Sequence, residues 1–98
     1  MIMVHCVAQT APEKQAEFIR RVNEAGIIEK TNEEAGCISY ELSSSAGVPG
    51  KMYIIERWES QKAMMKHARA PHYIELGKLR EEYGVSIDYT MYKAEALG

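Results

Sequence analysis

The sequence predicts an α+β protein with a ferredoxin-like βαββαβ order. Four segments carry the β-branched, aromatic and alternating pattern of strands, and the stretches between them carry the three- and four-residue spacing of helices. Only a turn-rich loop at residues 44–50 separates the second strand from the third, which indicates an antiparallel hairpin. With right-handed crossovers, this order gives a four-stranded antiparallel sheet with both helical units on one face.

Length and charge restrict the classes of function. The 98 residues predict a single domain over residues 1–98, and the formal net charge is −2 with acidic and basic residues interspersed. We therefore expect no nucleic-acid partner and no association with a membrane. Cys6 and Cys37 lack CxxC spacing and are expected to be buried and reduced. No signal-peptide pattern opens the sequence, so a cytoplasmic location is expected.

The first half of the chain predicts a strand and a long helix. Residues 2–9 have the strand pattern. Thr10 is expected to cap the following helix, with Glu13 completing a capping box. The helix is expected to run from about residue 11 to 32, although Gly26 costs about 1 kcal/mol relative to Ala inside a helix. A bend or a close helix contact is expected at that glycine.

The second half predicts the hairpin, two further helices and the last strand. On the second strand, Tyr40 is expected to share a face with Ile38 and Leu42. Ser60 is a suitable N-cap for the helix that follows the third strand. The expected strands cover residues 37–43, 52–59 and 86–94, and the expected helices cover residues 60–68 and 71–83.

The second face of this sheet is too apolar and aromatic to meet water. Such a face marks an interface or a ligand cavity. We therefore predict a homodimer through the open sheet face, with a cavity lined by strand residues. Whichever face is outward, each strand places a large or apolar residue on it: His5 or Cys6, Tyr40 or Cys37, Trp58 or Tyr53, and Tyr89 or Tyr92.

The polar residues form no familiar metal or nucleotide motif. His67 and His72 are five positions apart with a proline between them, which is not the one-turn spacing of a zinc-binding helix, so no metal site is predicted. Glu56 shares a strand face with Trp58 and either fixes a histidine tautomer or pairs with Arg57 at the rim. Each aromatic candidate also has a structural interpretation: Trp58 as plain core and His67 as a surface or capping residue.

Several segments together resemble the antibiotic biosynthesis monooxygenase (ABM) family, and especially its small quinol monooxygenase-like members. These are residues 34–41 (EAGCISYE), residues 55–60 (IERWES), His67, and residues 71–73 (PHY). The resemblance covers nearly the whole chain. It implies a dimeric α+β barrel and the oxidation of a small quinol-like or polyphenolic aromatic by O2, with no metal, flavin or other cofactor.

The resemblance also implies roles for particular residues. His67 is matched to a base or orienting group, Glu56 to the residue that fixes it, and Trp58 to the pocket wall, which makes these three the predicted catalytic residues. The predicted substrate-binding residues are Tyr40, His72 and His5.

Two alternatives remain open at this point. A relative that isomerises a phosphorylated dione shares the pattern from His67 to Tyr73, which keeps an isomerase in view. A non-catalytic dimeric binding or stress protein of the same fold is the other. Haem degradation is disfavoured, because His5 stands near the family's first-strand Asn and Gly77 stands near its haem-ligating His.

Overall fold

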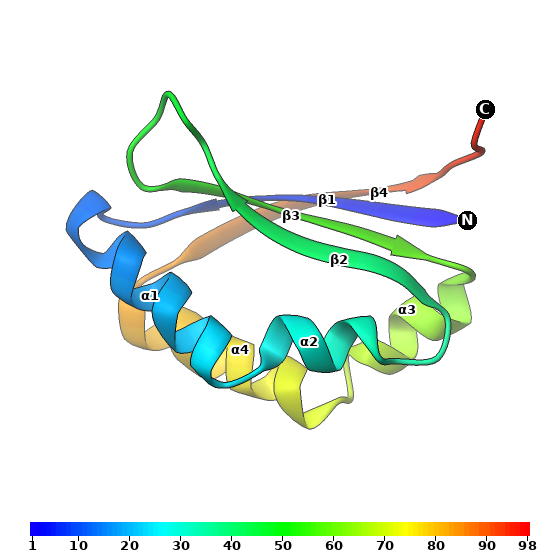
Figure 1. Ribbon diagram of the computed structural model, residues 1–98, viewed down its shortest axis with the longest axis horizontal. Helices are drawn as coiled ribbons and strands as arrows, with labels where there is room; N and C mark the ends of the chain where they lie inside the picture. Colours follow the sequence, from blue (N-terminus) through cyan, green and yellow to red (C-terminus); the bar gives the residue numbers. More distant parts are fainter.

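Four antiparallel strands form one sheet in the spatial order β2-β3-β1-β4 (Figure 1). The computed structural model describes residues 1–98. This order, with helical units after the first and third strands, confirms the predicted ferredoxin-like α+β fold. The strands are β1 (Ile2–Gln9), β2 (Cys37–Ser44), β3 (Lys51–Trp58) and β4 (Ser86–Lys93).

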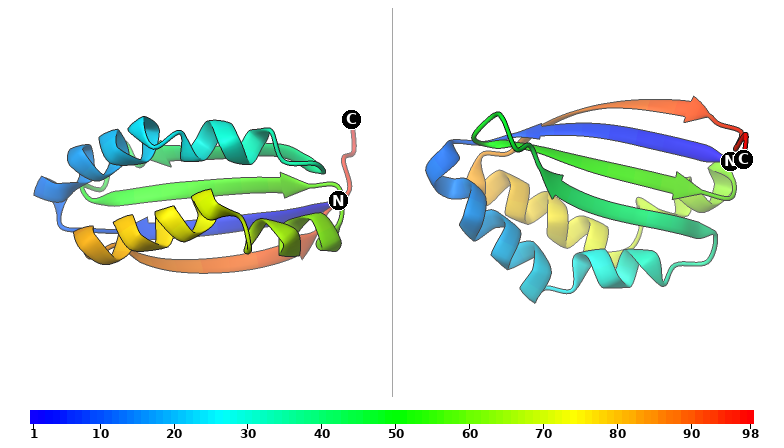
Figure 2. Two further views of the ribbon diagram at one scale, coloured as in Figure 1. Left: turned by 90° about the horizontal axis from the view of Figure 1, so that it is seen from below. Right: turned by 45° about the horizontal axis from the view of Figure 1, so that its top comes forward.

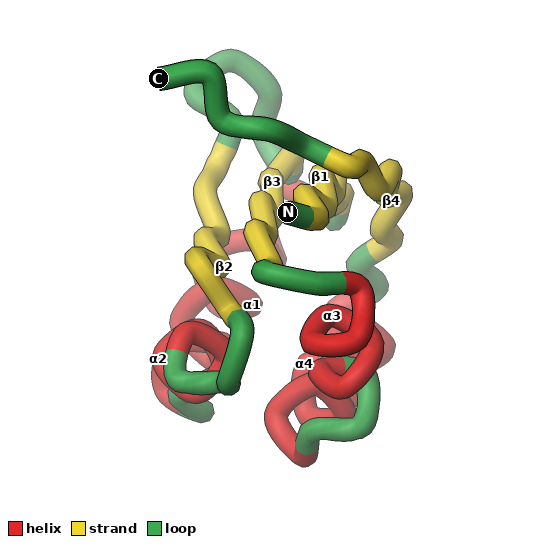
Figure 3. Tube along the Cα trace, turned by 90° about the vertical axis from the view of Figure 1, so that its right-hand side faces the viewer, coloured by secondary structure: helices red, strands yellow, loops and turns green.

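All helices lie against the same face of the sheet (Figures 1 and 2). Viewed from its end, the molecule has two helical columns, with α1 and α2 on the β2 side and α3 and α4 on the β4 side (Figure 3). No helix has the length and apolarity that crossing a membrane requires. The helices are α1 (Pro12–Glu24), α2 (Ile27–Asn32), α3 (Gln61–His67) and α4 (Pro71–Tyr83).

The predicted single helix over residues 11–32 is wrong, because the chain breaks at Gly26. That residue has φ +69°, a left-handed conformation that glycine adopts without steric cost. The Lys30 ammonium donates a hydrogen bond to the Ala25 carbonyl at 3.1 Å, which satisfies an acceptor freed by the break. The turn redirects α2 so that it packs beneath β2, where Asn32 can reach that strand.

Thr10 does not cap α1 as predicted. Ala11 occupies the cap position and makes no side-chain cap. The Thr10 hydroxyl instead donates to the Tyr83 carbonyl at 2.9 Å, so it satisfies an unpaired acceptor at the end of α4. The expectation for Ser60 is confirmed, because its hydroxyl accepts a hydrogen bond from the Ala63 amide at 3.1 Å.

A bulge in β2 changes which of its residues face the helices. Cys37 pairs with Trp58 and Tyr40 pairs with Glu56, although the two β2 residues are three positions apart. The extra residue lies between Cys37 and Ser39, and Ile38 is 44% exposed. The prediction that Ile38 shares a face with Tyr40 is therefore wrong.

The core fills the space between the sheet and the helices in two clusters. One cluster, around Phe18, Val22 and Met52, joins α1 and α4 to the sheet. The other cluster, around Tyr40, Ile54 and Trp58, lies toward α3. The opposite face of the sheet has no helix over it (Figure 1). We call this the bare face; its residues include Met3, His5, Val7, Tyr53, Ile55 and Tyr92.

Candidate active site

A cavity of about 1030 Å³ lies between the inner face of the sheet and helices α3 and α4. Twelve of its 19 lining residues are hydrophobic, and its volume suits a drug-sized organic molecule. Val4, Cys6 and Ile54 contribute the apolar floor from the sheet, while Tyr73 and Leu76 contribute the opposite wall from α4. The cavity can therefore hold an aromatic ring between the sheet and the two helices.

His67, at the end of α3, lines this cavity and is held by aromatic rings. Its ring centroid lies 5.2 Å from that of Trp58, 5.6 Å from that of Tyr40 and 5.1 Å from that of Tyr73. The residue is only 5% exposed. Because these neighbours restrict the imidazole, one ring edge is presented in a nearly fixed orientation.

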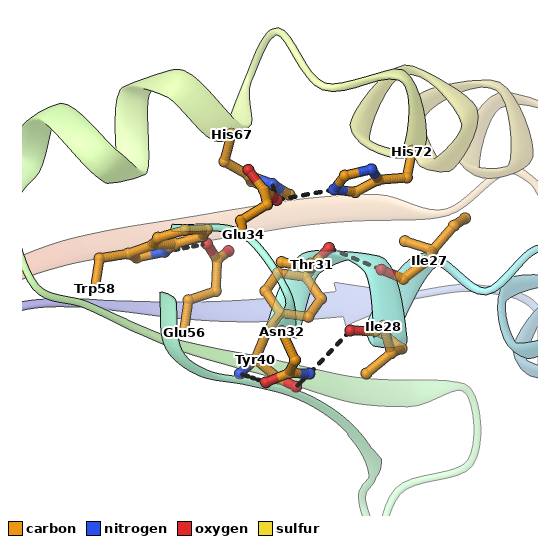
Figure 4. Close-up of polar contacts among 10 residues, drawn as sticks. All are labelled: Ile27, Ile28, Thr31, Asn32, Glu34, Tyr40, Glu56, Trp58, His67 and His72. Carbon is orange, nitrogen blue, oxygen red and sulfur yellow. Dashed lines mark hydrogen bonds and ion pairs between the residues drawn. The ribbon is translucent and has the colours of Figure 1, made fainter. Parts of the chain in front are cut away.

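The carboxylate of Glu34 fixes the tautomer of His67. Glu34 follows α2, and its Oε2 lies 2.5 Å from His67 Nδ1 and 2.8 Å from His72 Nε2 (Figure 4). An ionised carboxylate only accepts hydrogen bonds, so both contacting nitrogens carry hydrogen. In neutral His67 the other nitrogen, Nε2, is then an acceptor. It makes no hydrogen bond within the chain and can accept a proton from a molecule in the cavity.

Glu56 forms a second buried carboxylate site on β3. Its Oε1 accepts a hydrogen bond from Trp58 Nε1 at 2.9 Å (Figure 4), and the Cys6 thiol lies 3.7 Å from its Oε2. Burial raises the pKa of Glu56, and the two hydrogen bonds only partly offset that effect. Burial and the nearby Glu56 charge raise the pKa of Cys6 to about 12, so this thiol stays protonated at neutral pH.

Tyr40 supplies a neutral hydroxyl to the cavity. Asn32 holds its backbone on both sides, accepting from the Tyr40 amide at 3.0 Å and donating to its carbonyl at 2.9 Å (Figure 4). Burial raises the phenol pKa well above its usual value, so the group remains a hydrogen-bond donor. The hydroxyl has no partner within the chain and is free to bind an oxygen atom of a ligand.

Glu34, His67 and His72 are the one group whose composition resembles a metal site, with donor atoms within 4.8 Å of one another. Two ligands about 2.1 Å from a tetrahedral ion would be separated by about 3.4 Å. The Glu34 oxygen lies closer than this to both imidazole nitrogens. The three side chains thus have the geometry of a hydrogen-bonded relay. The sequence-based expectation of no metal site stays a prediction.

The structure brings some of the predicted site residues together and separates others. His67, Glu56 and Tyr40 line the same cavity. Trp58 is fully buried behind His67 and supports the ring without lining the cavity. His72 lies beyond Glu34 and borders a second cavity of about 330 Å³.

Two of the sequence-based expectations need correction. Val4 and Cys6 line the cavity, so His5 between them lies on the bare face, with its ring 6.0 Å from that of Tyr53. It does not reach the cavity within this chain. The residue that fixes His67 is Glu34, because Glu56 bonds to Trp58 and Cys6 instead.

Three residues of the site were not predicted from the sequence. Glu34 is the first residue of the segment that resembles the ABM family. Its place in that segment was the one feature of the sequence that could have indicated a role in the site. Tyr73 and Arg80 lie seven positions apart on α4 and both line the cavity. Helical spacing could have placed these two on one face, but nothing in the sequence showed that this face meets the cavity.

The antibiotic biosynthesis monooxygenase model matches residues 1–78. "Putative monooxygenase Rv0793" of Mycobacterium tuberculosis is 34% identical over 71 residues, which are 72% of this chain and 69% of that protein. A crystal structure of a "putative antibiotic biosynthesis monooxygenase" from Deinococcus radiodurans has a TM-score of 0.87 and 27% identity, covering 100% of this chain and 97% of the other. A conserved protein from Methanosarcina mazei has a TM-score of 0.83 and 27% identity, with coverages of 96% and 92%. The chain belongs to the antibiotic biosynthesis monooxygenase family.

Proposed function

We propose that this protein is a cofactor-independent monooxygenase that oxidises a small quinol-like or polyphenolic aromatic with O2. One observation carries the proposal: His67 borders an apolar cavity while its Nδ1 is bound to Glu34. This arrangement leaves Nε2 as a base in a site where an electron-rich ring can be held. The family and its relatives support a monooxygenase-type function.

In the proposed reaction, His67 removes a proton from a phenolic hydroxyl of the substrate. Glu34 stabilises the imidazolium that forms, because its carboxylate lies against Nδ1. Tyr40 donates a hydrogen bond to the phenolate oxygen, as its hydroxyl has no other partner. The phenolate is the electron-rich species that reacts with O2.

The proposed stoichiometry balances without an external reductant. A hydroquinone and one O2 give a hydroxyquinone and one water. One oxygen atom forms a new bond to ring carbon, and the other leaves as water. The substrate supplies all four electrons: its two phenolic O–H bonds are lost as the carbonyls form, and one ring C–H bond is replaced by C–OH. The proton first taken by His67 returns to the reduced oxygen, so the base is regenerated.

Oxygen uptake tests this proposal. Protein freed of metal by a chelator should consume O2 above the autoxidation rate with at least one member of a panel of reduced benzoquinones and naphthoquinones. The product should carry one oxygen atom from ¹⁸O-labelled O2. A panel that shows no uptake above background would contradict the proposed activity.

An isomerase that moves a proton between two carbons is the alternative, and the His67–Glu34–His72 relay favours it. One carboxylate links two histidines, so a proton taken by one can be balanced by the other. Such an enzyme would exchange substrate hydrogen with D2O without consuming O2. If neither O2 uptake nor exchange is found, a non-catalytic binding role is favoured instead.

We also propose that the bare face is covered by a second copy of the chain. Ile55 is 39% exposed and Tyr92 is 51% exposed on this face, which no helix covers. A chain of 98 residues gains substantially from such added burial. Sedimentation at micromolar concentration should give a dimer, and Ile55→Asp should shift it toward monomer. A monomeric parent protein would contradict this assignment.

A further inference from the structure

The cavity is basic although the chain as a whole is acidic. The formal net charge of the chain is −2. Among the lining residues, however, Lys62, Lys66, Arg69 and Arg80 are basic, and Glu56 is the one carboxylate. A concave site with this imbalance attracts anions and raises their local concentration. The charge therefore suggests that the ligand is negatively charged.

Arg80 differs from the other three basic residues of the cavity because it is partly buried. Its Nε atom is buried and has no hydrogen-bond partner. It also takes no part in any of the ion pairs within the chain, whereas Arg20 and Arg21 on α1 are both paired. Lys62, Lys66 and Arg69 are exposed. The guanidinium is always charged, so the cavity holds an uncompensated cation.

The partly buried guanidinium of Arg80, which has no ion-pair partner, favours the binding of an anion. Its Nε has lost its hydrogen bond to water and gained none in return, whereas its two terminal nitrogens are not among the buried unpaired atoms. An oxyanion in the cavity would accept hydrogen bonds from the terminal nitrogens of Arg80 and neutralise its charge beside a largely apolar wall. An uncharged ligand of the same shape could accept a hydrogen bond but could not neutralise the charge, so the site should bind it more weakly.

We propose that Arg80 is the binding site for an oxyanion substituent of the substrate, so that the cavity takes an aromatic molecule with a phenolic hydroxyl at one end and a carboxylate or phosphate at the other. This inference rests on the proposed function for the hydroxyl end alone, where His67 is the base. The oxyanion end is argued from the charge of Arg80, its place in the lining of the cavity and its lack of an ion-pair partner.

Helix geometry sets the distance between the two ends. Tyr73, Leu76 and Arg80 follow at spacings of three and four, so they share one face of α4, and all three line the cavity. Tyr73 contacts His67, with ring centroids 5.1 Å apart. Seven residues of helix span about 10 Å. A two-ring aromatic with substituents at opposite ends fits this length better than a single bare ring.

Binding of redox-inert ligands tests the proposal independently of O2 chemistry. The probes are 6-hydroxy-2-naphthoate, its neutral amide 6-hydroxy-2-naphthamide, and the phosphate monoester of the corresponding naphthalenediol. Calorimetry at about 0.15 M ionic strength should show the carboxylate or the phosphate binding about 10- to 100-fold more tightly than the amide, as expected for hydrogen bonds to charged groups. The tighter of the two anions identifies the oxyanion. Equal affinity for all three would overturn the proposal.

The variants locate the anion within the cavity. Arg80→Gln should abolish the preference for the anion and leave the affinity for the amide within about threefold, which also shows that the cavity is intact. Arg80→Lys keeps the charge and should retain part of the preference. Arg20→Gln, which removes an exposed charge on α1, is the control and should bind as the parent does. If the preference survives in Arg80→Gln and is lost in Lys66→Gln, the anion site is at the mouth and the assignment to Arg80 is wrong.

Discussion

His67 Nδ1 lies 2.5 Å from Glu34 Oε2, although 33 positions separate the two residues in the chain. Glu34 stands between α2 and β2, and His67 ends α3, so the contact joins the two helical columns below the sheet. A carboxylate in this position holds the imidazole in one orientation and stabilises its charged form. The contact therefore determines what His67 can do in the cavity.

Glu34→Gln should impair catalysis without unfolding the protein. The amide can offer one oxygen acceptor, but it cannot stabilise the imidazolium or accept equally from both histidines. We expect kcat/KM for quinol oxidation to fall on the order of 100-fold. Oxygen uptake measures the loss, and Glu33→Gln, at the neighbouring exposed carboxylate, is the matched control. Parental kcat/KM in Glu34→Gln would remove Glu34 from the mechanism.

The two histidines should differ sharply in importance. His67→Gln removes the proposed base, and kcat should fall about 10²- to 10⁴-fold. His72→Gln leaves His67 and Glu34 in contact, so kcat should fall less than about tenfold. The measurement is steady-state O2 uptake over a range of pH values. Equal losses in the two variants would show that the relay acts as a unit, and a larger loss for His72→Gln would reverse the assigned roles.

Glu56 should make stability fall as the pH rises. Burial raises the pKa of Glu56 above that of a carboxyl group in the unfolded chain. At pH values between these two pKa values, the folded protein holds a proton on Glu56 that the unfolded chain releases. Stability is then lost as the pH increases from the usual carboxyl value of about 4.3 through the raised folded value. Glu56→Gln removes this titration and keeps an acceptor for Trp58 Nε1. The Tm of the variant relative to the parent should therefore be higher at pH 7 than at pH 4 in thermal unfolding. A difference independent of pH would contradict the role of burial.

Gly50→Ala should destabilise the fold, whereas Gly47→Ala in the same loop should not. Gly50 has φ +81°, and an added Cβ would lie 2.3 Å from the Thr10 carbonyl oxygen. We expect a loss of roughly 1–3 kcal/mol for the strained backbone, which corresponds to about 4–8 °C in Tm for each kcal/mol. A Cβ on Gly47 meets nothing within 4 Å. Matched thermal unfolding of the two variants makes the comparison, and equal Tm values would be inconsistent with the close approach at Gly50.

Local patterns were sufficient to predict the element order and the sheet. Alternation over Ile2–Gln9 and the start of α4 at Pro71 depend on residues adjacent in sequence, and both agree with the structure. The break at Gly26 and the partner of Thr10 depend on what the chain meets after folding. The cost of about 1 kcal/mol for glycine inside a helix indicates that the helix is weak at Gly26. It does not predict that the chain turns there through a left-handed conformation.

The candidate site was predictable only in part, because its key contacts cross the fold. His67, Glu56 and Tyr40 were identified and do share a cavity. The spacing of His67 and His72 gave no indication that Glu34 would lie between them. Strand alternation separates the two faces of β1 but does not show which face the helices cover. His5 lies on the face opposite the helices, and only the folded arrangement shows this.

The bulge in β2 makes the number of residues in this strand, and not only their identity, decide which side chains face the cavity. Alternation along a strand has a period of two, so one extra residue is a half-period phase shift for everything on one side of it. Here that shift allows Cys37 and Tyr40 to face the same way. Deleting Ile38 would remove the extra residue and leave Cys37 and Tyr40 two positions apart, so both would still face the same way in a strictly alternating strand. A deletion elsewhere in this strand, with the bulge unchanged, would instead exchange a cavity-facing side chain for its neighbour while every motif residue keeps its identity.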